Sequence, residues 1–303
     1  FELEILKDNE LIKDTKTGII KEIHDARQQE NYDLKNVINL VKMFISFRDR
    51  PGSIFNDLYE LLLSNTDKFY DDFFKAKFEG TSFQSYLEIS SQQFSRESEI
   101  MNSIFSKEDT TRRELLLTCL QDLYVSREDL FCSGDEPMIS TALINSNIKP
   151  LKWLAETYSA YDITVDTLYK TCAQFIKNQM LKLADNFTPQ MKANEIQDNI
   201  KQLMTITDNL SSPYLIVFAG SKSAKLELDT RIKEAWNDPA FNIEENFCVY
   251  LDSQYKSEFK NMSQEEKDQF PSTVARFYSM LSDKKKFSGI YETWMVRRFI
   301  KMG

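Results

Sequence analysis

The sequence predicts an all-α protein, and three properties of its 303 residues lead to that fold class. Glycine and proline are scarce, with 7 of each, where average usage would give about 21 and 15. Few glycines mean few tight turns, which argues against hairpin-rich sandwiches, barrels and Gly-rich nucleotide folds. With 42% hydrophobic and 28% charged residues the chain is not disordered either. Apolar residues recur at three- and four-residue steps, which is the helical period.

The first half of the chain predicts a series of amphipathic helices. Residues 1–29 are expected to form two, whose apolar sides consist of Leu3, Ile5 and Leu6, then of Ile19, Ile20, Ile23 and Ala26. A clearer helix covers 33–47. It ends before residue 53, because Pro51 and Gly52 are adjacent there.

A long helix is expected over residues 54–78. Its predicted apolar face consists of Leu58, Leu61, Leu62, Phe69, Phe73 and Phe74. Its predicted solvent face consists of Asp57, Glu60, Asp67, Asp71 and Asp72. Gly80 ends it, and Thr81 or Ser82 is expected to cap the next helix, because a hydroxyl accepts the free amide hydrogens of a first turn. We therefore expect three phenylalanines to be largely buried, namely Phe69, Phe73 and Phe94.

Helices are expected to continue to the end of the chain. They cover about 82–105, 110–125, 137–146, 148–160, 164–185, 190–210, 223–236, 241–259, 263–281 and 284–300, with a loop at 133–137. Ser263 and Glu266 form a capping-box pattern, and Pro271 is expected to kink or restart its helix. Nearly every helix has one apolar stripe and one charged face, which suits stacked layers in a rod or solenoid better than one round core.

The composition argues against several classes of function. A formal net charge of −9 is unlike that of a general nucleic-acid binder. The four cysteines, Cys119, Cys132, Cys172 and Cys248, form no CxxC pair, so we expect buried thiols in a reduced compartment rather than a zinc site.

Nothing in the sequence predicts membrane contact. The longest apolar run, 214–219, is far shorter than the ~20 residues that a membrane span needs. We expect no signal peptide. Because the chain begins with Phe1 rather than Met, we expect it to be a segment of a longer protein.

Two features that resemble reactive sites have simpler explanations. His24 is the only histidine, and neither a catalytic arrangement nor a metal site has a second suitable residue near it, so we interpret it as a surface or edge residue. Residues 215–223 resemble the tail of a phosphate-binding loop, but Ser221 separates Gly220 from Lys222. We interpret this segment as a helix end followed by a helix start.

The acidic pairs Asp71-Asp72 and Glu244-Glu245 lie on faces predicted to be solvated. Acid–base catalysis needs carboxylates in an apolar cleft, and no such cleft is indicated. We therefore predict no catalytic residue, no cofactor and no metal ion.

The C-terminal segment differs in charge from the rest. Residues 283–303 carry a net charge of +4, from two acidic residues and from Lys284, Lys285, Lys286, Arg297, Arg298 and Lys301. One interpretation is an electrostatic contact with an acidic partner or a following domain. The other is a basic helix end that interacts favourably with its own dipole.

Residues 250–303 resemble the cullin family. Cullins there have a Tyr-hydrophobic-Asp-Ser helix, as in Tyr250-Leu251-Asp252-Ser253, and an aromatic cluster, as in Phe277-Tyr278. Phe287, Tyr291 and the segment 296–300 fit the next helix and its end. Met295-Val296 departs from the usual Leu-Ala, and Lys285-Lys286 stands where Asp is usual.

The resemblance extends upstream. The segments 61–70, 82–87 and 96–99 are similar to the second cullin repeat, in which a Thr-x-x-Phe-Tyr helix precedes a Tyr-hydrophobic step and a Glu-rich helix. Residues 115–117 through 130–131 fit the same order. The similarity is thin between 185 and 245.

The resemblance implies an elongated, curved stalk of stacked cullin repeats. It implies the end of a first repeat at 1–50, a second at 51–160, a third at 161–281 and the start of a C-terminal domain at 282–303. It also implies a non-catalytic scaffold of a cullin-RING ubiquitin ligase in the cytoplasm and nucleus. The adaptor for the substrate receptor and the RING protein would bind mainly outside this segment, so no partner-binding residue is assigned. The alternative is another helical-rod interaction protein, such as a vesicle-tethering or solenoid subunit.

Overall fold

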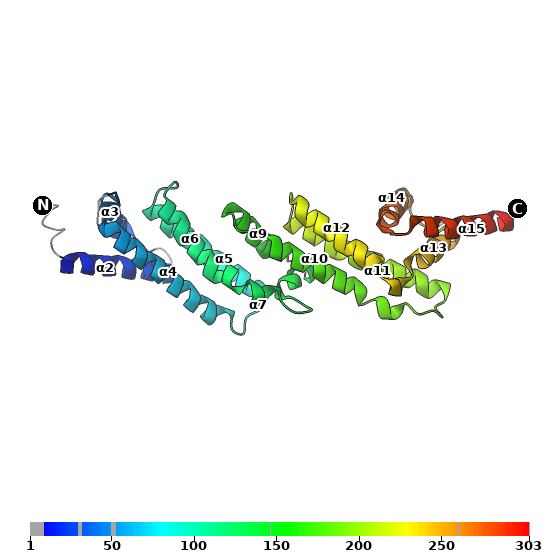
Figure 1. Ribbon diagram of the computed structural model, residues 1–303, viewed down its shortest axis with the longest axis horizontal. Coiled ribbons are helices and arrows are strands. Elements are labelled where there is room, and N and C mark those ends of the chain that lie inside the picture. Colours follow the sequence, from blue (N-terminus) through cyan, green and yellow to red (C-terminus); the bar gives the residue numbers. More distant parts are fainter. Residues whose placement is uncertain (1–8, 30–31, 50–52, 146, 260, 303) are drawn as a thin grey trace. The chain divides into compact units, whose positions relative to one another are not determined.

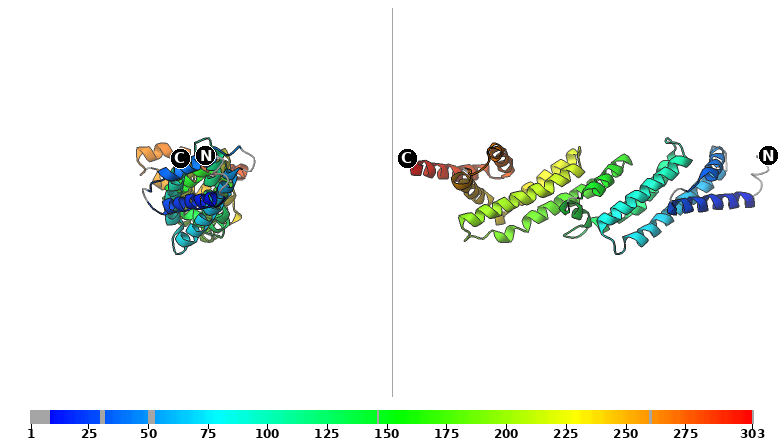
Figure 2. Two further views of the ribbon diagram at one scale, coloured as in Figure 1. Left: turned by 90° about the vertical axis from the view of Figure 1, so that its left-hand side faces the viewer. Right: turned by 180° about the vertical axis from the view of Figure 1, so that it is seen from behind.

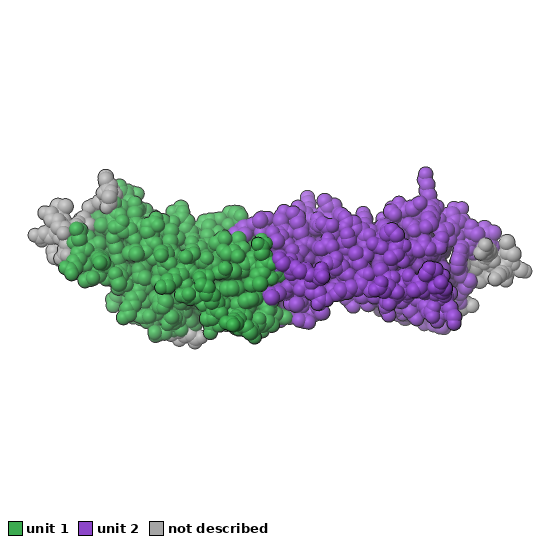
Figure 3. Space-filling model, turned by 60° about the horizontal axis from the view of Figure 1, so that its bottom comes forward, with its two compact units in different colours: residues 1–131, 156–162 green, residues 132–155, 163–303 purple. Residues whose placement is uncertain are grey.

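The computed structural model describes residues 9–29, 32–49, 53–145, 147–259 and 261–302, and within these ranges it is helical without a strand (Figure 1). The predicted all-α fold class is confirmed. The chain divides into two compact units, shown in Figure 3. Unit 1 comprises Phe1–Phe131 and Glu156–Asp162, and unit 2 comprises Cys132–Ala155 and Ile163–Gly303. The repeat boundaries expected from the sequence stay predictions.

Unit 1 is built on helices that pack through their buried stripes. They are α2 (Asn9–Gln28), α3 (Lys35–Ile45), α4 (Ile54–Phe78), α5 (Phe83–Ile104) and α6 (Thr110–Leu123), followed by the 3-10 turn η1 (Val125–Arg127) and α7 (Glu128–Cys132). Helix α4 packs against α6, and α2 packs against both α4 and α5. Helices α5 and α6 lie side by side in the two views of Figures 1 and 2. The expected helix that contains Leu3, Ile5 and Leu6 lies outside the described residues.

Local signals set the ends of α4 where the sequence predicts them. The Ser53 hydroxyl accepts a hydrogen bond from the Phe55 amide at 3.2 Å and so caps the first turn. Beyond the last turn Gly80 has a φ of +72°, a left-handed conformation that glycine adopts without a steric penalty. Ser82, rather than Thr81, caps α5 by accepting from the Ser85 amide at 3.2 Å.

The buried face of α4 differs from the prediction. It consists of Phe55, Leu58, Leu62, Thr66, Tyr70 and Phe74. Phe69 and Phe73 are only half-buried and Leu61 is 45% exposed, so the expectation of a buried Phe69 and Phe73 is wrong, whereas that for Phe94 is confirmed. The buried face continues in steps of four residues from Leu62 through Thr66 and Tyr70 to Phe74. A prediction based on apolar residues alone does not include Thr66 and Tyr70, and it therefore assigned neighbouring positions to the buried face.

Unit 2 contains the remaining helices. They are η2 (Met138–Ser140), α8 (Thr141–Ile144), the first part of α9 (Lys149–Ala160), α10 (Asp166–Leu181), η3 (Ala184–Asn186), α11 (Ala193–Val217), α12 (Lys222–Trp236), η4 (Pro239–Phe241), α13 (Ile243–Ser253), the π-helical η5 (Gln254–Glu258), α14 (Gln264–Met280) and α15 (Lys284–Met302). Helix α10 packs against α11 and α12, and α13 packs against α11 and α15. Figure 1 shows α10 beside α12.

Two helices continue through an internal proline. Helix α11 was expected to end near residue 210, yet it continues through Pro213 to Val217. Tyr214 explains the extension, because its ring is fully buried and its hydroxyl donates to the Ala224 carbonyl at 2.9 Å. Helix α14 is likewise continuous across Pro271, so a restart there is wrong. Phe270 and Phe277, both buried, hold the two sides of that proline against the core.

Aromatic rings dominate the core of unit 2. Trp236 is fully buried and its ring centroid lies 4.8 Å from that of Phe277 and 5.9 Å from that of Phe247. All three tryptophans, Trp153, Trp236 and Trp294, belong to unit 2. Indole fluorescence therefore reports mainly on this unit, although Trp153 lies on α9, whose last residues belong to unit 1.

Candidate functional site

The most unusual group of side chains is a buried ion pair in unit 1. Arg27, on α2, is 1% exposed, and Glu97, on α5, is fully buried. The Arg27 guanidinium binds the carboxylate with both arms of its fork: Nη2 lies 2.7 Å from Oε1 and Nε lies 2.8 Å from Oε2. A planar, bidentate pair of this kind is strong and fixes the orientation of both groups.

Helix α4 completes the hydrogen bonding of this pair. Arg27 also donates to the Thr66 hydroxyl at 2.6 Å and to the Asn65 side-chain oxygen at 2.8 Å, and Tyr70 donates its hydroxyl to Glu97 at 2.8 Å. Three helices therefore meet at one charge pair whose polar atoms are largely satisfied. Such a group specifies how the helices pack, because any other arrangement would leave a buried charge without a partner.

The surroundings of the pair keep the Arg27 guanidinium charged. Burial by itself lowers the pKa of Arg27, but the adjacent Glu97 carboxylate outweighs that effect and holds the pKa above its ordinary value. Burial, reinforced by Cys119 and by Glu97, raises the pKa of Tyr70 well above its ordinary value, so the phenol stays a hydrogen-bond donor.

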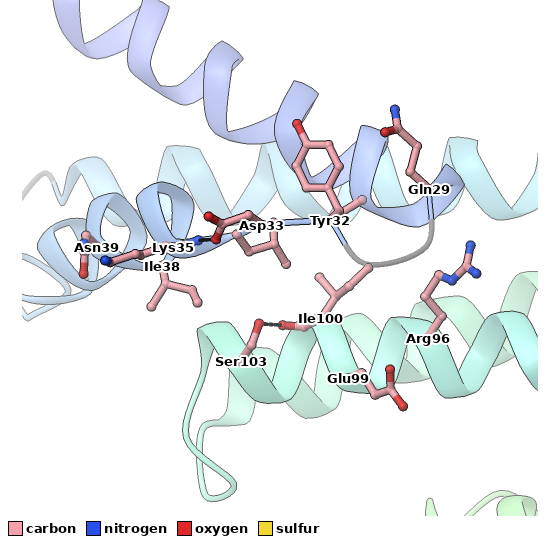
Figure 4. Close-up of a pocket in the computed structure, with 12 residues that line it drawn as sticks. Gln29, Tyr32, Asp33, Lys35, Ile38, Asn39, Arg96, Glu99, Ile100 and Ser103 are labelled. Carbon is pink, nitrogen blue, oxygen red and sulfur yellow. Dashed lines mark hydrogen bonds between the residues drawn. The ribbon is translucent and has the colours of Figure 1, made fainter.

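Two open grooves flank this cluster, and Arg96 lines both. One, of about 610 Å³, runs between the start of α3 and α5 (Figure 4). Its polar groups are largely engaged with neighbours, since Tyr32 donates to Glu22 at 2.7 Å and Asp33 accepts from the Lys35 amide at 2.9 Å.

The second groove, of about 650 Å³, is lined by His24, Phe69, Phe73, Ile89 and Arg96, among others. The His24 ring lies edge-on to Phe69 at 5.3 Å, and its Nε2 is 3.1 Å from the Gln28 amide nitrogen. The sequence interpretation of His24 as an edge residue is confirmed.

One member of each acidic pair lies on a solvated face, as predicted, whereas the Glu244 side chain is only 12% exposed, so the prediction is wrong for that residue. Asp72 and Glu245 are exposed. Asp71 binds Lys75 and Arg127, and its hydrogen bond with Lys75 lowers its pKa. Glu244 pairs with Lys286 at 3.4 Å. Within the part of the chain that the structure describes, no group of three His, Cys, Asp or Glu side chains could hold a metal ion.

Three of the four cysteines are buried, whereas Cys132 is partly accessible. Burial raises the pKa of the Cys119 and Cys172 thiols, and it raises that of Cys248 to about 12. Thiols held in this state are poor nucleophiles, because the reactive form is the thiolate.

The segment 215–223 is a helix-to-helix connection, as predicted. Helix α11 ends at Val217, Gly220 has a φ of +85°, and the Ser221 hydroxyl accepts from the Ala224 amide at 3.1 Å to cap α12. The amides at the start of α12 are thus partly used by the protein itself. The segment does not form a phosphate-binding loop.

The C-terminal basic residues divide between the two ends of α15. Lys284, Lys285 and Lys286 form its first turn, where the helix dipole disfavours cations. A favourable dipole interaction is therefore wrong as an explanation for these three. Lys286 instead reaches Glu244, and the Lys284 ammonium lies 5.9 Å from the Tyr278 ring centroid. The side chains of Arg297, Arg298 and Lys301 lie outside the described part.

The described side chains of unit 1 form a helix-packing cluster at Arg27 and Glu97. Most groups with perturbed pKa values in the described ranges are phenols, thiols and ion-paired residues, and burial raises the pKa of one further carboxyl, Asp122, to about 7. None of the helices in those ranges has both the length and the hydropathy to cross a bilayer.

The comparison with known families assigns the protein class. The model of the Cullin alpha solenoid domain matches residues 1–302, nearly the whole chain. The chain therefore belongs to the cullin family, whose members are scaffolds of ubiquitin ligases and generally bind adaptor and RING proteins. A search of the curated proteins found no match. The family match favours a cullin over the alternative of a vesicle-tethering subunit.

The sequence analysis missed the buried ion pair. Thr66 and Tyr70 continue the four-residue steps of Leu58 and Leu62, so the helical period alone places them on the buried face. That signal was available for α4. Nothing local pairs Arg27 with Glu97, which lies 70 residues further along the chain.

Proposed function

We propose that this chain is a rigid scaffold segment of a multisubunit cullin-RING ubiquitin ligase. It holds a substrate-receptor module, with its adaptor, at a fixed distance from the RING protein and its ubiquitin-charged enzyme. The observation that carries the proposal is the cullin-family match over residues 1–302. The contribution of this segment to ubiquitin transfer is then geometric, because a fixed separation raises the effective concentration of one reactant at the other.

The packing within each unit supports a stiff segment. In unit 1 the Arg27–Glu97 pair joins three helices at one buried point. In unit 2 the capped start of α14, where Ser263 and Glu266 exchange hydrogen bonds, follows the short connection at Asn261-Met262. Short, capped connections leave each helix little freedom to move relative to the next.

A flexible insertion tests the geometric account. A Gly/Ser linker is placed between Asn261 and Met262 in the full-length protein, where an exposed loop tolerates added length at modest entropic cost. We expect adaptor and RING pull-downs to be unchanged and ubiquitin transfer to a bound substrate to fall. The matched control replaces Asn261 and Met262 by Gly and Ser without adding length, and it should transfer at the wild-type rate.

The outcome separates two roles. Unchanged transfer with the linker in place would show that the segment is only a tether, and the rigid-scaffold proposal would be abandoned. Failure of the full-length protein to recover both an adaptor and a RING protein would contradict membership of such a ligase. The proposal also places the protein in the cytoplasm and nucleus, which imaging of the tagged full-length protein tests.

A further inference from the structure

Unit 2 has a surface groove that the proposed function does not use. It has a volume of about 600 Å³ and is lined by the connection after η3, the start of α11, η4, α13 and α15. Most of its lining is apolar or aromatic, with side chains such as Phe187, Pro189, Met191, Val249, Ile290 and Trp294. A groove of this composition suits an apolar ligand or an apolar segment of a partner.

The walls of this groove are held in place by packing and hydrogen bonds within unit 2. Phe187 lies edge-on to the buried Phe241, with ring centroids 5.0 Å apart, and the Asn246 side chain donates to the Phe241 carbonyl at 2.7 Å. The rings of Phe247 and Phe287 lie 5.7 Å apart and join α13 to α15. Because the groove is preformed, an occupant loses little binding free energy in ordering it.

One carboxylate sets the charge of the groove. Among the described residues that line it, Glu245 is the only one with an ionisable side chain, and it is exposed. Glu245 accepts a hydrogen bond from the Asn242 side-chain amide at 2.6 Å, and no cation in the described part of the chain pairs with it. The adjacent Glu244 is already paired with Lys286 at 3.4 Å. The groove is therefore apolar and negatively charged, which complements a cation carried between apolar groups.

Trp294 is a second feature that suits a cation. Its indole is half-buried and lines the groove from α15. Among aromatic rings, the face of an indole attracts Lys and Arg side chains most strongly. Tryptophan is also enriched among the residues that carry most of the binding energy of interfaces. Together, Glu245 and Trp294 can bind the charged head of an Arg or Lys side chain while its aliphatic stem lies on apolar surface.

We propose that this groove binds a segment of a partner protein that presents one arginine or lysine side chain between apolar side chains. The cationic head lies at Glu245, and the apolar neighbours pack on Trp294 and Phe187. The groove belongs to unit 2 alone, so the proposal does not depend on membership of a ubiquitin ligase.

Calorimetric titration of the full chain with matched peptides tests the role of the charge. The probe is the synthetic peptide Ser-Leu-Leu-Arg-Leu-Leu-Ser, and its control carries citrulline, a neutral isostere, in place of arginine. We expect the arginine peptide to bind about tenfold more tightly, because its hydrogen bond to the carboxylate is charge-assisted.

Two variants locate that advantage. Glu245→Gln keeps the shape of the side chain and should remove the difference between the two peptides. Glu292→Gln removes an exposed carboxylate of α15 that does not line the groove, so it is the matched control and should keep the difference. Equal affinities of the two peptides for the wild type, or the same loss in Glu292→Gln as in Glu245→Gln, would overturn the proposal.

The indole signals show where the peptide binds. The chain has three tryptophans, so ¹⁵N-indole spectra contain three resonances, of which Trp294→Phe identifies one. We expect the arginine peptide to shift this resonance and to leave the other two unchanged. A peptide that binds without shifting it would overturn the proposal.

Two other occupants of the groove would also contradict the proposal. If arginine amide binds as tightly as the peptide, the groove is a site for a small cation. If sedimentation shows that the wild type self-associates and that Glu245→Gln does not, the groove is an interface between two copies of this chain.

Discussion

Unit 1 and unit 2 are both helical, yet they hold their helices together in different ways. Unit 1 buries a charged pair, Arg27 and Glu97, neither of which has any accessible side-chain surface. In unit 2, each ion pair among the described residues keeps at least one side chain accessible to water, as Lys182 and Glu136 do at 52% and 69%. Its core consists instead of rings such as Trp236, Phe241 and Phe247.

This difference shows which interactions specify the packing of the helices. An aromatic core tolerates small changes of shape, because dispersion and hydrophobic burial are not directional. A buried ion pair tolerates very little, because the loss of one partner leaves the other charged and desolvated. Unit 1 has an aromatic cluster as well, with rings such as Phe74, Tyr86 and Phe131, so the charged pair that joins three of its helices is what distinguishes it from unit 2.

The largest expected effect comes from breaking the pair. Glu97→Ala leaves the Arg27 guanidinium buried without a counter-charge, and we expect unit 1 to lose about 3–5 kcal/mol of stability. Hydrogen exchange of α2, α4 and α5 measures this loss. Glu136→Ala removes an exposed pair in unit 2 and should leave tryptophan-monitored unfolding unchanged. A loss below about 1 kcal/mol for Glu97→Ala would contradict the role given to the pair.

A double substitution sharpens this result. Arg27→Met combined with Glu97→Leu removes both charges and restores apolar packing, so it should cost less than Glu97→Ala alone. If the double variant is less stable than Glu97→Ala, the hydrogen bonds to Thr66, Asn65 and Tyr70 contribute more to stability than the charge pair itself.

The next effect tests the buried face of α4 with two adjacent rings. Phe74 is 9% exposed, whereas Phe73 is half-buried. We expect Phe74→Ala to cost about 3 kcal/mol, near the lower end of the range for large-to-small core changes, and Phe73→Ala to cost clearly less. Chemical denaturation followed by far-UV circular dichroism measures both. Equal losses would show that the face assigned by the structure is wrong.

The smallest expected effect compares the same substitution in both units. The Tyr86 hydroxyl in unit 1 and the Tyr214 hydroxyl in unit 2 each donate to a backbone carbonyl, at 3.0 and 2.9 Å. Tyr86→Phe and Tyr214→Phe should each cost about 1 kcal/mol, the usual value for one such hydrogen bond. A much larger loss of stability for Tyr86→Phe than for Tyr214→Phe would mean that buried hydrogen bonds in general, and not only the buried ion pair, stabilise unit 1 more than unit 2.

Helix positions could be predicted well because their signals are local. The ends of α4 follow from Ser53 and Gly80, and the start of α14 follows from the Ser263–Glu266 capping box. The extension of α11 through Pro213 could not be predicted, because a contact with the next helix, from Tyr214 to Ala224, outweighs the helix-breaking tendency of proline. Local propensity yields to tertiary packing in such cases.

The buried polar cluster could not be predicted for a related reason. Whether Arg27 or Asp122 is buried depends on partners that only the fold brings close. The family resemblance, by contrast, could be read from the sequence, since its motifs lie within single helices at 58–99 and 250–300. It predicts the architecture but not which charges the architecture encloses.

The distance along the chain between Arg27 and Glu97 has a consequence for synthesis. Glu97 is added 70 residues after Arg27, so at about 5–20 residues per second the ribosome needs roughly 4–14 s to supply the carboxylate. During that interval α2 has neither its counter-ion nor the amide of Gln93, which in the finished protein donates to the Arg27 carbonyl at 3.1 Å. Helix α2 can therefore bind Asn65 and Thr66 of α4 first, and it completes its polar contacts only after α5 has been synthesised.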